Sequence, residues 1–191
     1  MKRKYYIIVS LCLCLLCFNQ LVQAQRYLPG QQGVQLTTGL VDGKLNRQNY
    51  LAGFTYSKYI KSGNHLALGA ELLNYSSKYI KIEIPVTQMT AETGYYFHLF
   101  SDRRKNIFFS LGPSIMLGYE TINWGEKSLS DGSIITARDR FIYGGALGIE
   151  IEGYITDRLV LVLNLRERLL WGTDTSSFHN QISVGIKYIL E

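Results

Sequence analysis

Residues 107–120 read Ile-Phe-Phe-Ser-Leu-Gly-Pro-Ser-Ile-Met-Leu-Gly-Tyr-Glu, and this stretch decides the fold class. From Ile107 to Tyr119 every second residue is apolar, whereas the residues between them are mostly small or polar and end in Glu120. Alternation with a period of two predicts a β-strand with two unlike faces. Its 14 residues exceed the ~5–6 typical of soluble strands and suffice for the ~9–11 that cross a membrane.

The same two-faced alternation recurs along the chain. Three further clear runs occupy 143–155, 159–169 and 178–188, and four weaker runs occupy 33–41, 49–60, 65–76 and 84–98. Eight strands satisfy the even count of single-chain bacterial barrels. We therefore predict an all-β fold, an eight-stranded antiparallel up-and-down transmembrane β-barrel of the outer-membrane type.

The predicted connections alternate in length. The short ones are 61–64, 101–106 and 156–158, and the longer ones are 42–48, 77–83, 121–140 and 172–177, although the last of these is short. Outer-membrane barrels have short periplasmic turns and longer external loops, so 121–140 is expected outside. We expect partner contacts on this loop, with Trp124, Glu126, Lys127, Asp131 and Arg138 as the candidate residues.

Aromatic residues gather near the predicted strand ends, where the aromatic girdles of membrane barrels lie. The chain has 14 tyrosines and only three prolines, a balance that favours strands. The residues expected in the girdles are Tyr50, Tyr59, Tyr75, Tyr79, Tyr95, Tyr119, Tyr143, Trp171 and Tyr188.

Charged residues fall on the face that is predicted to point into the barrel. They are Glu71, Glu92, Glu120, Glu150, Glu152, Arg166, Arg168 and Lys187. A buried charge is costly unless it is paired, and an eight-stranded barrel has just enough interior for side chains. A structural ion network that fills the lumen is therefore favoured over a charge-lined pore or gate, which stays the functional alternative.

Residues 1–24 are expected to be a signal peptide. A basic start at residues 2–4 precedes an apolar stretch at 5–18, and Val22-Gln23-Ala24 has small side chains where a signal peptidase reads. All three cysteines lie in this segment. Cleavage after Ala24 leaves 25–191 as a single barrel domain without thiol chemistry. Because the segment carries three basic residues, the overall charge of +5 does not indicate a nucleic-acid partner.

The histidines predict no catalytic or metal site. His65, His98 and His179 have no metal-ligand spacing, and the predicted domain has no cysteine for a zinc site. His179 and Ser183 share a strand face but lie roughly 13 Å apart, too far for a nucleophile and its base. We expect no enzyme activity, no cofactor and no metal.

Several longer motifs resemble one known family. They are Arg26-Tyr27-Leu28-Pro29-Gly30, Tyr119-Glu120-Thr121, Asn123-Trp124-Gly125-Glu126-Lys127, Phe141-Ile142-Tyr143-Gly144-Gly145-Ala146-Leu147, Thr156-Asp157-Arg158 and Arg166-Glu167-Arg168-Leu169-Leu170-Trp171-Gly172. With these motifs the chain resembles the TraO proteins of Bacteroidetes conjugative transposons. The family carries no assigned catalytic residues.

The resemblance implies a non-enzymatic outer-membrane component of a conjugative DNA-transfer apparatus. The expected partners are outer-membrane lipid and other conjugative-transfer proteins, with no direct nucleic-acid contact. One alternative is a general outer-membrane barrel for surface adhesion or envelope stability. Another is a soluble periplasmic ligand-binding barrel, in which the apolar faces would point inward and the charged faces outward.

Overall fold

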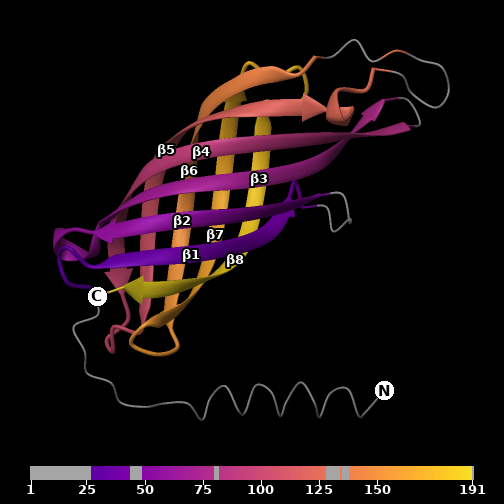
Figure 1. The fold of residues 1–191 in the computed structure, drawn as a ribbon. Coiled ribbons are helices and arrows are strands. Elements are labelled where there is room, and N and C mark those ends of the chain that lie inside the picture. Colours follow the sequence, from indigo (N-terminus) through magenta and orange to yellow (C-terminus); the bar gives the residue numbers. More distant parts are fainter. Residues whose placement is uncertain (1–26, 44–48, 80–81, 128–133, 135–137, 191) are drawn as a thin grey trace, which may run out of the picture.

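The computed structural model describes residues 27–43, 49–79, 82–127, 134 and 138–190, and the expected signal peptide lies outside them. The described chain forms an up-and-down barrel (Figure 1). Its strands are β1 (Gln32–Val41), β2 (Tyr50–Tyr59), β3 (His65–Tyr79), β4 (Ile82–Ser101), β5 (Ile107–Ile122), β6 (Arg140–Tyr154), β7 (Leu159–Trp171) and β8 (Phe178–Leu190). Two single-turn 3₁₀ helices, η1 (Lys61–Gly63) and η2 (Asn123–Gly125), lie in connections.

Each strand pairs antiparallel with its neighbour in sequence, and β8 pairs with β1 to close the sheet. The predicted fold is thus confirmed, and all eight strands lie where alternation placed them. Within the closed wall each strand is paired on both sides, as lipid requires, whereas the long-loop ends of β3 and β4 pair only with each other. Within the described residues, no helix is both long enough and apolar enough to cross a membrane.

The strands run further than the apolar alternation indicated. β4 has 20 residues and extends beyond both ends of the predicted 84–98, and β6 begins at Arg140 rather than at 143. The backbone ladder explains the difference. Pairing between β3 and β4 continues to Tyr79 opposite Ile82, because backbone hydrogen bonds need no apolar side chain. The alternation detects only the part of a strand that faces an apolar medium.

The outer wall is apolar and the inner wall is polar. Along β8, exposed residues such as Ile182, Val184 and Ile186 alternate with the buried Gln181, Ser183 and Lys187. Leu36 and Ile115 are 68% and 69% exposed, whereas Arg168 and Lys187 are 0% exposed. This is the reverse of the arrangement that a soluble ligand-binding barrel requires, and it is the arrangement of a wall that contacts lipid.

Apolar layers lie at both ends of the lumen. One cluster at the long-loop end includes Val41, Leu51 and Leu73, and another at the short-turn end includes Val160, Val162 and Ile189. Glu152 and Lys187 lie level with the short-turn cluster, because they pair with Val162 and Val160. The lumen is therefore a filled core in which apolar and charged side chains lie side by side.

The β4–β5 turn is built around the carboxylate of Asp102. Its Oδ1 accepts hydrogen bonds from the backbone N–H of Asn106 (2.6 Å) and Ile107 (2.9 Å), and its Oδ2 accepts one from Arg104 (3.3 Å). Burial alone would raise the pKa of Asp102, but these backbone hydrogen bonds lower it below its usual value. The charged carboxylate is the form that holds the turn.

Replacing Asp102 with alanine is expected to speed trypsin cleavage of the folded protein at Arg103–Lys105 about threefold, because the turn loses its acceptors. In the unaltered protein, the hydrogen-exchange protection factors of 104–107, which are corrected for the intrinsic pH dependence of exchange, should fall as the pH falls below ~4. The pKa of Asp102 is lower in the folded protein than in the unfolded chain. Its stabilisation of the turn is therefore fully present above the unfolded-state pKa and is lost as the pH falls through the folded-state pKa. Trypsin should cleave the Asp102→Asn variant at an intermediate rate, because asparagine keeps one acceptor oxygen. Equal rates for all three proteins would refute this role.

Candidate functional site

The first part of the candidate site is a buried arginine cluster on β7. Arg168 donates through Nη1 to Oε1 of Glu71 (2.8 Å) and through Nη2 to Oγ1 of Thr90 (3.2 Å). Its Nε and Nη2 also lie 3.2 and 3.1 Å from the sulfur of Met116. Gln181 donates to the same oxygen of Glu71 from β8 (2.7 Å). β3, β4, β5, β7 and β8 thus meet at one guanidinium and its carboxylate.

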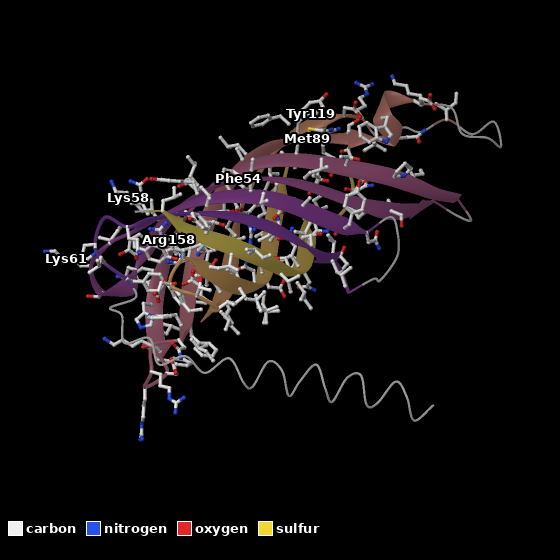
Figure 2. The ribbon with its side chains drawn as sticks, turned by 60° about the horizontal axis from the view of Figure 1, so that its bottom comes forward. Phe54, Lys58, Lys61, Met89, Tyr119 and Arg158 are labelled. Carbon is white, nitrogen blue, oxygen red and sulfur yellow. The ribbon has the colours of Figure 1, made fainter. Side chains whose placement is uncertain are left out.

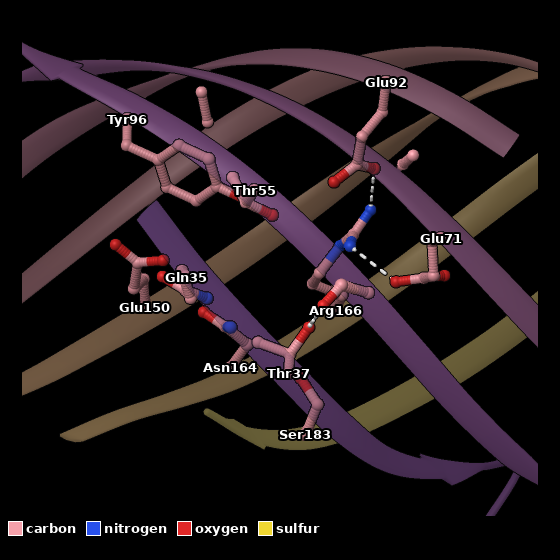
Figure 3. Close-up of a pocket in the computed structure, with 13 residues that line it drawn as sticks. Gln35, Thr37, Thr55, Glu71, Glu92, Tyr96, Glu150, Asn164, Arg166 and Ser183 are labelled. Carbon is pink, nitrogen blue, oxygen red and sulfur yellow. Dashed lines mark hydrogen bonds and ion pairs between the residues drawn. The ribbon is translucent and has the colours of Figure 1, made fainter. Parts of the chain in front are cut away.

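Arg166 extends this cluster across the lumen. Its Nη1 bonds Oε2 of Glu71 at 3.2 Å, and its Nη2 bonds Glu92 (Figure 3). The residues around Arg166, including Glu150 and Asn164, line a cavity of about 20 Å³. Such a cavity holds about one water molecule. The middle of the lumen therefore offers no open path.

A second ion cluster surrounds the buried Lys187 on β8. Its Nζ lies 3.1 Å from Oε1 of Glu150, and it also bonds Glu152. Tyr59 donates to Oε1 of Glu152 (2.7 Å), and His65 Nε2 lies 3.2 Å from Oε1 of Glu150. The buried ammonium of Lys187 thus faces two buried carboxylates, and Tyr59 and His65 complete their contacts.

Tyr27 closes the short-turn end beneath Lys187. Its hydroxyl donates to Glu152, and its ring stacks on Tyr59 with the centroids 4.0 Å apart. Burial raises the pKa of Tyr27 well above its usual value, and the charge of Glu152 adds to the rise. The hydroxyl therefore remains a donor throughout the physiological range. Residues just before β1 thus cap the lumen.

Glu120 lies apart from both ion clusters, at the long-loop end of β5. It is 0% exposed, and its hydrogen bonds within the described residues come from uncharged donors. These donors are Tyr75 (3.3 Å), Gln88 (2.8 Å), Thr173 (2.9 Å) and Thr175 (3.1 Å). The structure thus brings seven of the eight charged residues predicted for the lumen into two ion clusters, and it gives Glu120 a different role. Glu120 ties the β7–β8 connection onto the mouth of the barrel.

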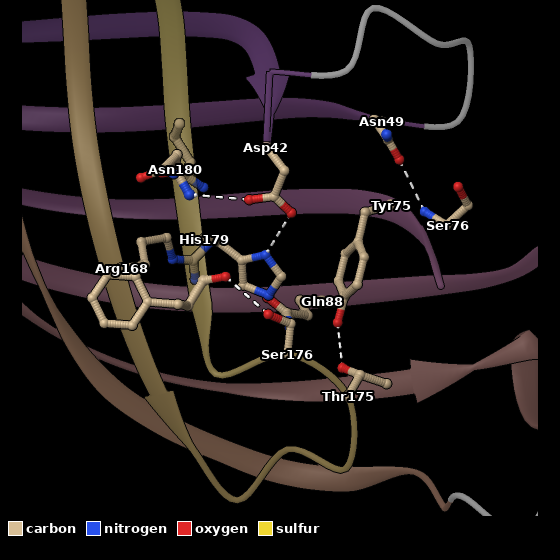
Figure 4. Close-up of polar contacts among 12 residues, drawn as sticks. Asp42, Asn49, Tyr75, Ser76, Gln88, Arg168, Thr175, Ser176, His179 and Asn180 are labelled. Carbon is tan, nitrogen blue, oxygen red and sulfur yellow. Dashed lines mark hydrogen bonds and ion pairs between the residues drawn. The ribbon is translucent and has the colours of Figure 1, made fainter. Parts of the chain in front are cut away.

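The three histidines are held by neighbours within the barrel. Nδ1 of His179 lies 3.1 Å from Oδ2 of Asp42, and Tyr75 packs against its ring (Figure 4). His65 stacks on Tyr96 with the centroids 5.0 Å apart, and His98 packs against Phe108. These contacts position the rings inside the barrel wall.

Two tyrosines that were predicted for the girdles point inward instead. Tyr59 is 1% exposed and Tyr75 is 5% exposed, so the girdle prediction is wrong for both. The reason is strand parity, which means that residues an even number of positions apart share a face of a strand. Tyr75 lies four residues from Glu71 on β3 and therefore shares its inward face. Tyr50, Tyr119, Tyr143, Trp171 and Tyr188 do lie outward, between 41% and 51% exposed. The girdle prediction for these two tyrosines relied on their nearness to a strand end, whereas parity would have placed them inside the barrel.

The candidate partner loop between β5 and β6 has an ordered base. Oδ1 of Asp139 accepts from the N–H of Ile122 (2.9 Å), and Oδ2 accepts from Oγ1 of Thr121 (3.2 Å). Nε of Arg140 lies 3.0 Å from Oδ2 of Asp174 in the next connection. These contacts fix both ends of the loop to the barrel rim.

The loop residues predicted to contact partners are exposed where the structure describes them. Trp124 is 68% exposed and has a φ of 53° in η2, where Glu126 donates its N–H to the carbonyl of Asn123 (3.0 Å). Glu126, Lys127 and Arg138 are also exposed, and Asp131 lies outside the described residues. An exposed tryptophan on an ordered turn is a typical anchor for a protein interface.

An apolar outer wall, a closed antiparallel sheet and a lumen filled with paired charges define the class: this is a small β-barrel of the outer-membrane type. The chain belongs to the family of the conjugative transposon protein TraO, whose model matches residues 28–190. No curated protein sequence matches the chain.

Solved structures share the fold at low sequence identity. The N-terminal β-barrel domain of Pseudomonas aeruginosa OprF is 10% identical, with a TM-score of 0.52 over 84% of this chain and 98% of that one. Yersinia pestis Ail, in complex with the heparin analogue sucrose octasulfate, is 10% identical, with a TM-score of 0.55 over 85% and 100% of the two chains. A major outer membrane protein of Thermus thermophilus is 8% identical, with a TM-score of 0.55 over 85% and 100%. These similarities establish the fold.

Proposed function

We propose that this protein is a non-enzymatic outer-membrane barrel that anchors partners of a conjugative DNA-transfer apparatus. The observation that carries the proposal is the TraO family match over 28–190 on a barrel with a lipid-facing outer wall. An apolar wall of this kind is stable only in a bilayer, and a closed barrel is the form in which strands cross one.

The barrel acts as an anchor rather than as a conduit. Its charged inner residues are engaged across the lumen, and the cavity beside Arg166 has room for about one water molecule. A nucleic-acid strand would have to displace the whole buried ion network. The same filling supports a role without catalysis, because a substrate would find no space beside the inner carboxylates.

Partner contacts are assigned to the β5–β6 loop. Trp124 supplies a large exposed aromatic surface, and Asp139 and Asp174 fix the base from which it projects. Trp124 lies on the described turn η2, and a side chain that is already positioned loses less conformational freedom when it binds. The partners are other transfer proteins that reach the external face.

Deleting 123–137 is expected to reduce conjugative transfer at least about tenfold while the barrel still assembles, because the deletion removes Trp124 but keeps Asp139. Transfer is measured by mating frequency, and assembly by heat-modifiable gel migration in the outer-membrane fraction. Trp124→Ala should lower transfer in the same direction. The matched control replaces 128–130 and 132–137 with Gly and Ser, keeps all five candidate contact residues and should transfer like the unaltered protein. Wild-type transfer by the deletion variant would reject the loop as the partner surface.

A further inference from the structure

The end of the barrel that carries the short turns is strongly basic. Its exposed basic side chains come from β2, η1 and the turns after β4 and β6, and they are Lys58, Lys61, Arg103, Arg104, Lys105 and Arg158. Outside the lumen, the described acidic side chains at this end are Asp102 and Asp157. Lys58, Lys61 and Arg158 lie together at this end, whereas Phe54, Met89 and Tyr119 follow the wall away from it (Figure 2). We call the six basic residues the basic rim.

The opposite end has no such excess among its described residues. There the acidic Asp42, Glu126, Asp139 and Asp174 balance the basic Lys127, Arg138 and Arg140. Part of this balance is direct, since Arg140 pairs with Asp174 at 3.0 Å. Among the described side chains, the basic excess therefore lies at the end that carries the short turns.

The carboxylate of Asp102 is engaged by backbone N–H groups of its own turn. Its carboxylate accepts three backbone hydrogen bonds, from residues 104, 106 and 107. The neighbouring basic side chains of Arg103–Lys105 are exposed. They remain accessible to an external anion.

The basic rim adjoins the edge of the apolar outer wall. Lys58 points outward from β2 opposite Leu66, which is 46% exposed. Phe100 and Ile107 flank the β4–β5 turn and are 56% and 43% exposed, and Ile155 near Arg158 is 60% exposed. Lysine and arginine stems cover apolar surface while their charged ends reach outward. In a bilayer these charged ends lie at the level of the phosphates.

We propose that the basic rim binds the headgroups of anionic phospholipids in the leaflet that surrounds the short turns. The proposal rests on the membrane placement given under Proposed function. The residues of the basic rim lie in or beside three separate connections around the barrel. This arrangement fits a lipid layer that surrounds the barrel better than a single linear polyanion. Clustered basic residues beside an apolar span attract anionic lipids through this same electrostatic field.

The test uses the full protein in nanodiscs that contain phosphatidylcholine and phosphatidylglycerol in equal amounts. Spin-labelled versions of both lipids report, by electron paramagnetic resonance, the fraction immobilised at the barrel. We expect phosphatidylglycerol to be favoured at least about threefold, and ~1 M salt to remove most of the preference. The combined variant Lys61→Gln, Arg103→Gln, Arg104→Gln should bring the ratio near one. The control variant Lys127→Gln, Arg138→Gln should keep it.

Heat-modifiable migration of each variant from the same nanodiscs reports separately whether the barrel is folded in the membrane. A folded barrel with equal association of both lipids would overturn the proposal and leave the membrane placement standing. Binding of a single-stranded oligonucleotide to the barrel in pure phosphatidylcholine nanodiscs, lost in the triple variant while both lipids associate equally, would assign the rim to nucleic acid and overturn it too.

Discussion

Replacing Lys187 with methionine is expected to lower the free energy of unfolding of the barrel by about 3–5 kcal/mol. Methionine keeps most of the length of the unbranched apolar stem and removes the charged ammonium group. The buried carboxylates of Glu150 and Glu152 would then face each other without the cation that now lies 3.1 Å from Glu150. The hydroxyls of Tyr27 and Tyr59, which stay beside Glu152, supply hydrogen bonds but no positive charge. Urea-dependent unfolding in phospholipid vesicles, followed by tryptophan fluorescence, measures the loss.

Two companion variants separate the charge effect from general damage. Adding Glu152→Gln to Lys187→Met should recover about 1–3 kcal/mol, because one unpaired buried charge disappears. Lys61→Met, at an exposed lysine of η1, should change stability by less than about 0.5 kcal/mol. If Lys187→Met unfolded at the same urea concentration as the unaltered protein, the ion cluster would have no structural role.

The strands could be predicted from the sequence because lipid imposes a strict two-sided pattern. Residues 107–120 alternate apolar and small or polar side chains, and they do so because one face of β5 contacts lipid and the other fills the lumen. Where the chain leaves that environment, as at the start of β4 or at Arg140, the pattern stops while the backbone pairing continues. Strand existence was therefore predictable, and strand length was not.

The residues of the lumen were predictable, but their partners were not. Parity places Glu71, Glu150 and Arg168 on inward faces, whereas the pairing of Arg168 with Glu71 joins residues 97 positions apart and depends on the stagger of the closed sheet. Parity also predicts that Tyr75 points inward, but its position near a strand end led to the girdle prediction instead. Alternation could not predict the place of Tyr27 in the lumen, because this residue precedes the first alternating run. A turn at 28–31 separates it from β1.

Replacing Gly144 with alanine is expected to lower the free energy of unfolding by more than about 3 kcal/mol, beyond the usual cost of an oversized core residue. A Cβ at Gly144 would lie 2.1 Å from the carbonyl oxygen of Leu169 and 3.0 Å from Cα of Leu170. Both atoms belong to the backbone of β7, so no side-chain rotation can relieve the contact. The strands must separate where β6 pairs with β7. The fraction of heat-modifiable barrel and its urea midpoint report the loss.

Gly153→Ala on the same strand is the matched control, because a Cβ there meets nothing closer than the carbonyl oxygen of Leu161 at 3.9 Å. It should change stability by less than about 1 kcal/mol, although it adds the same methyl group to β6. The contrast isolates close approach of the strands from any general cost of losing a glycine. The displaced segment of β7 also carries Arg168, whose guanidinium must reach Glu71 across the lumen. A shift at Gly144 would therefore weaken the arginine cluster as well as the sheet, and equal stability of the two variants would show that β6 and β7 are free to adjust.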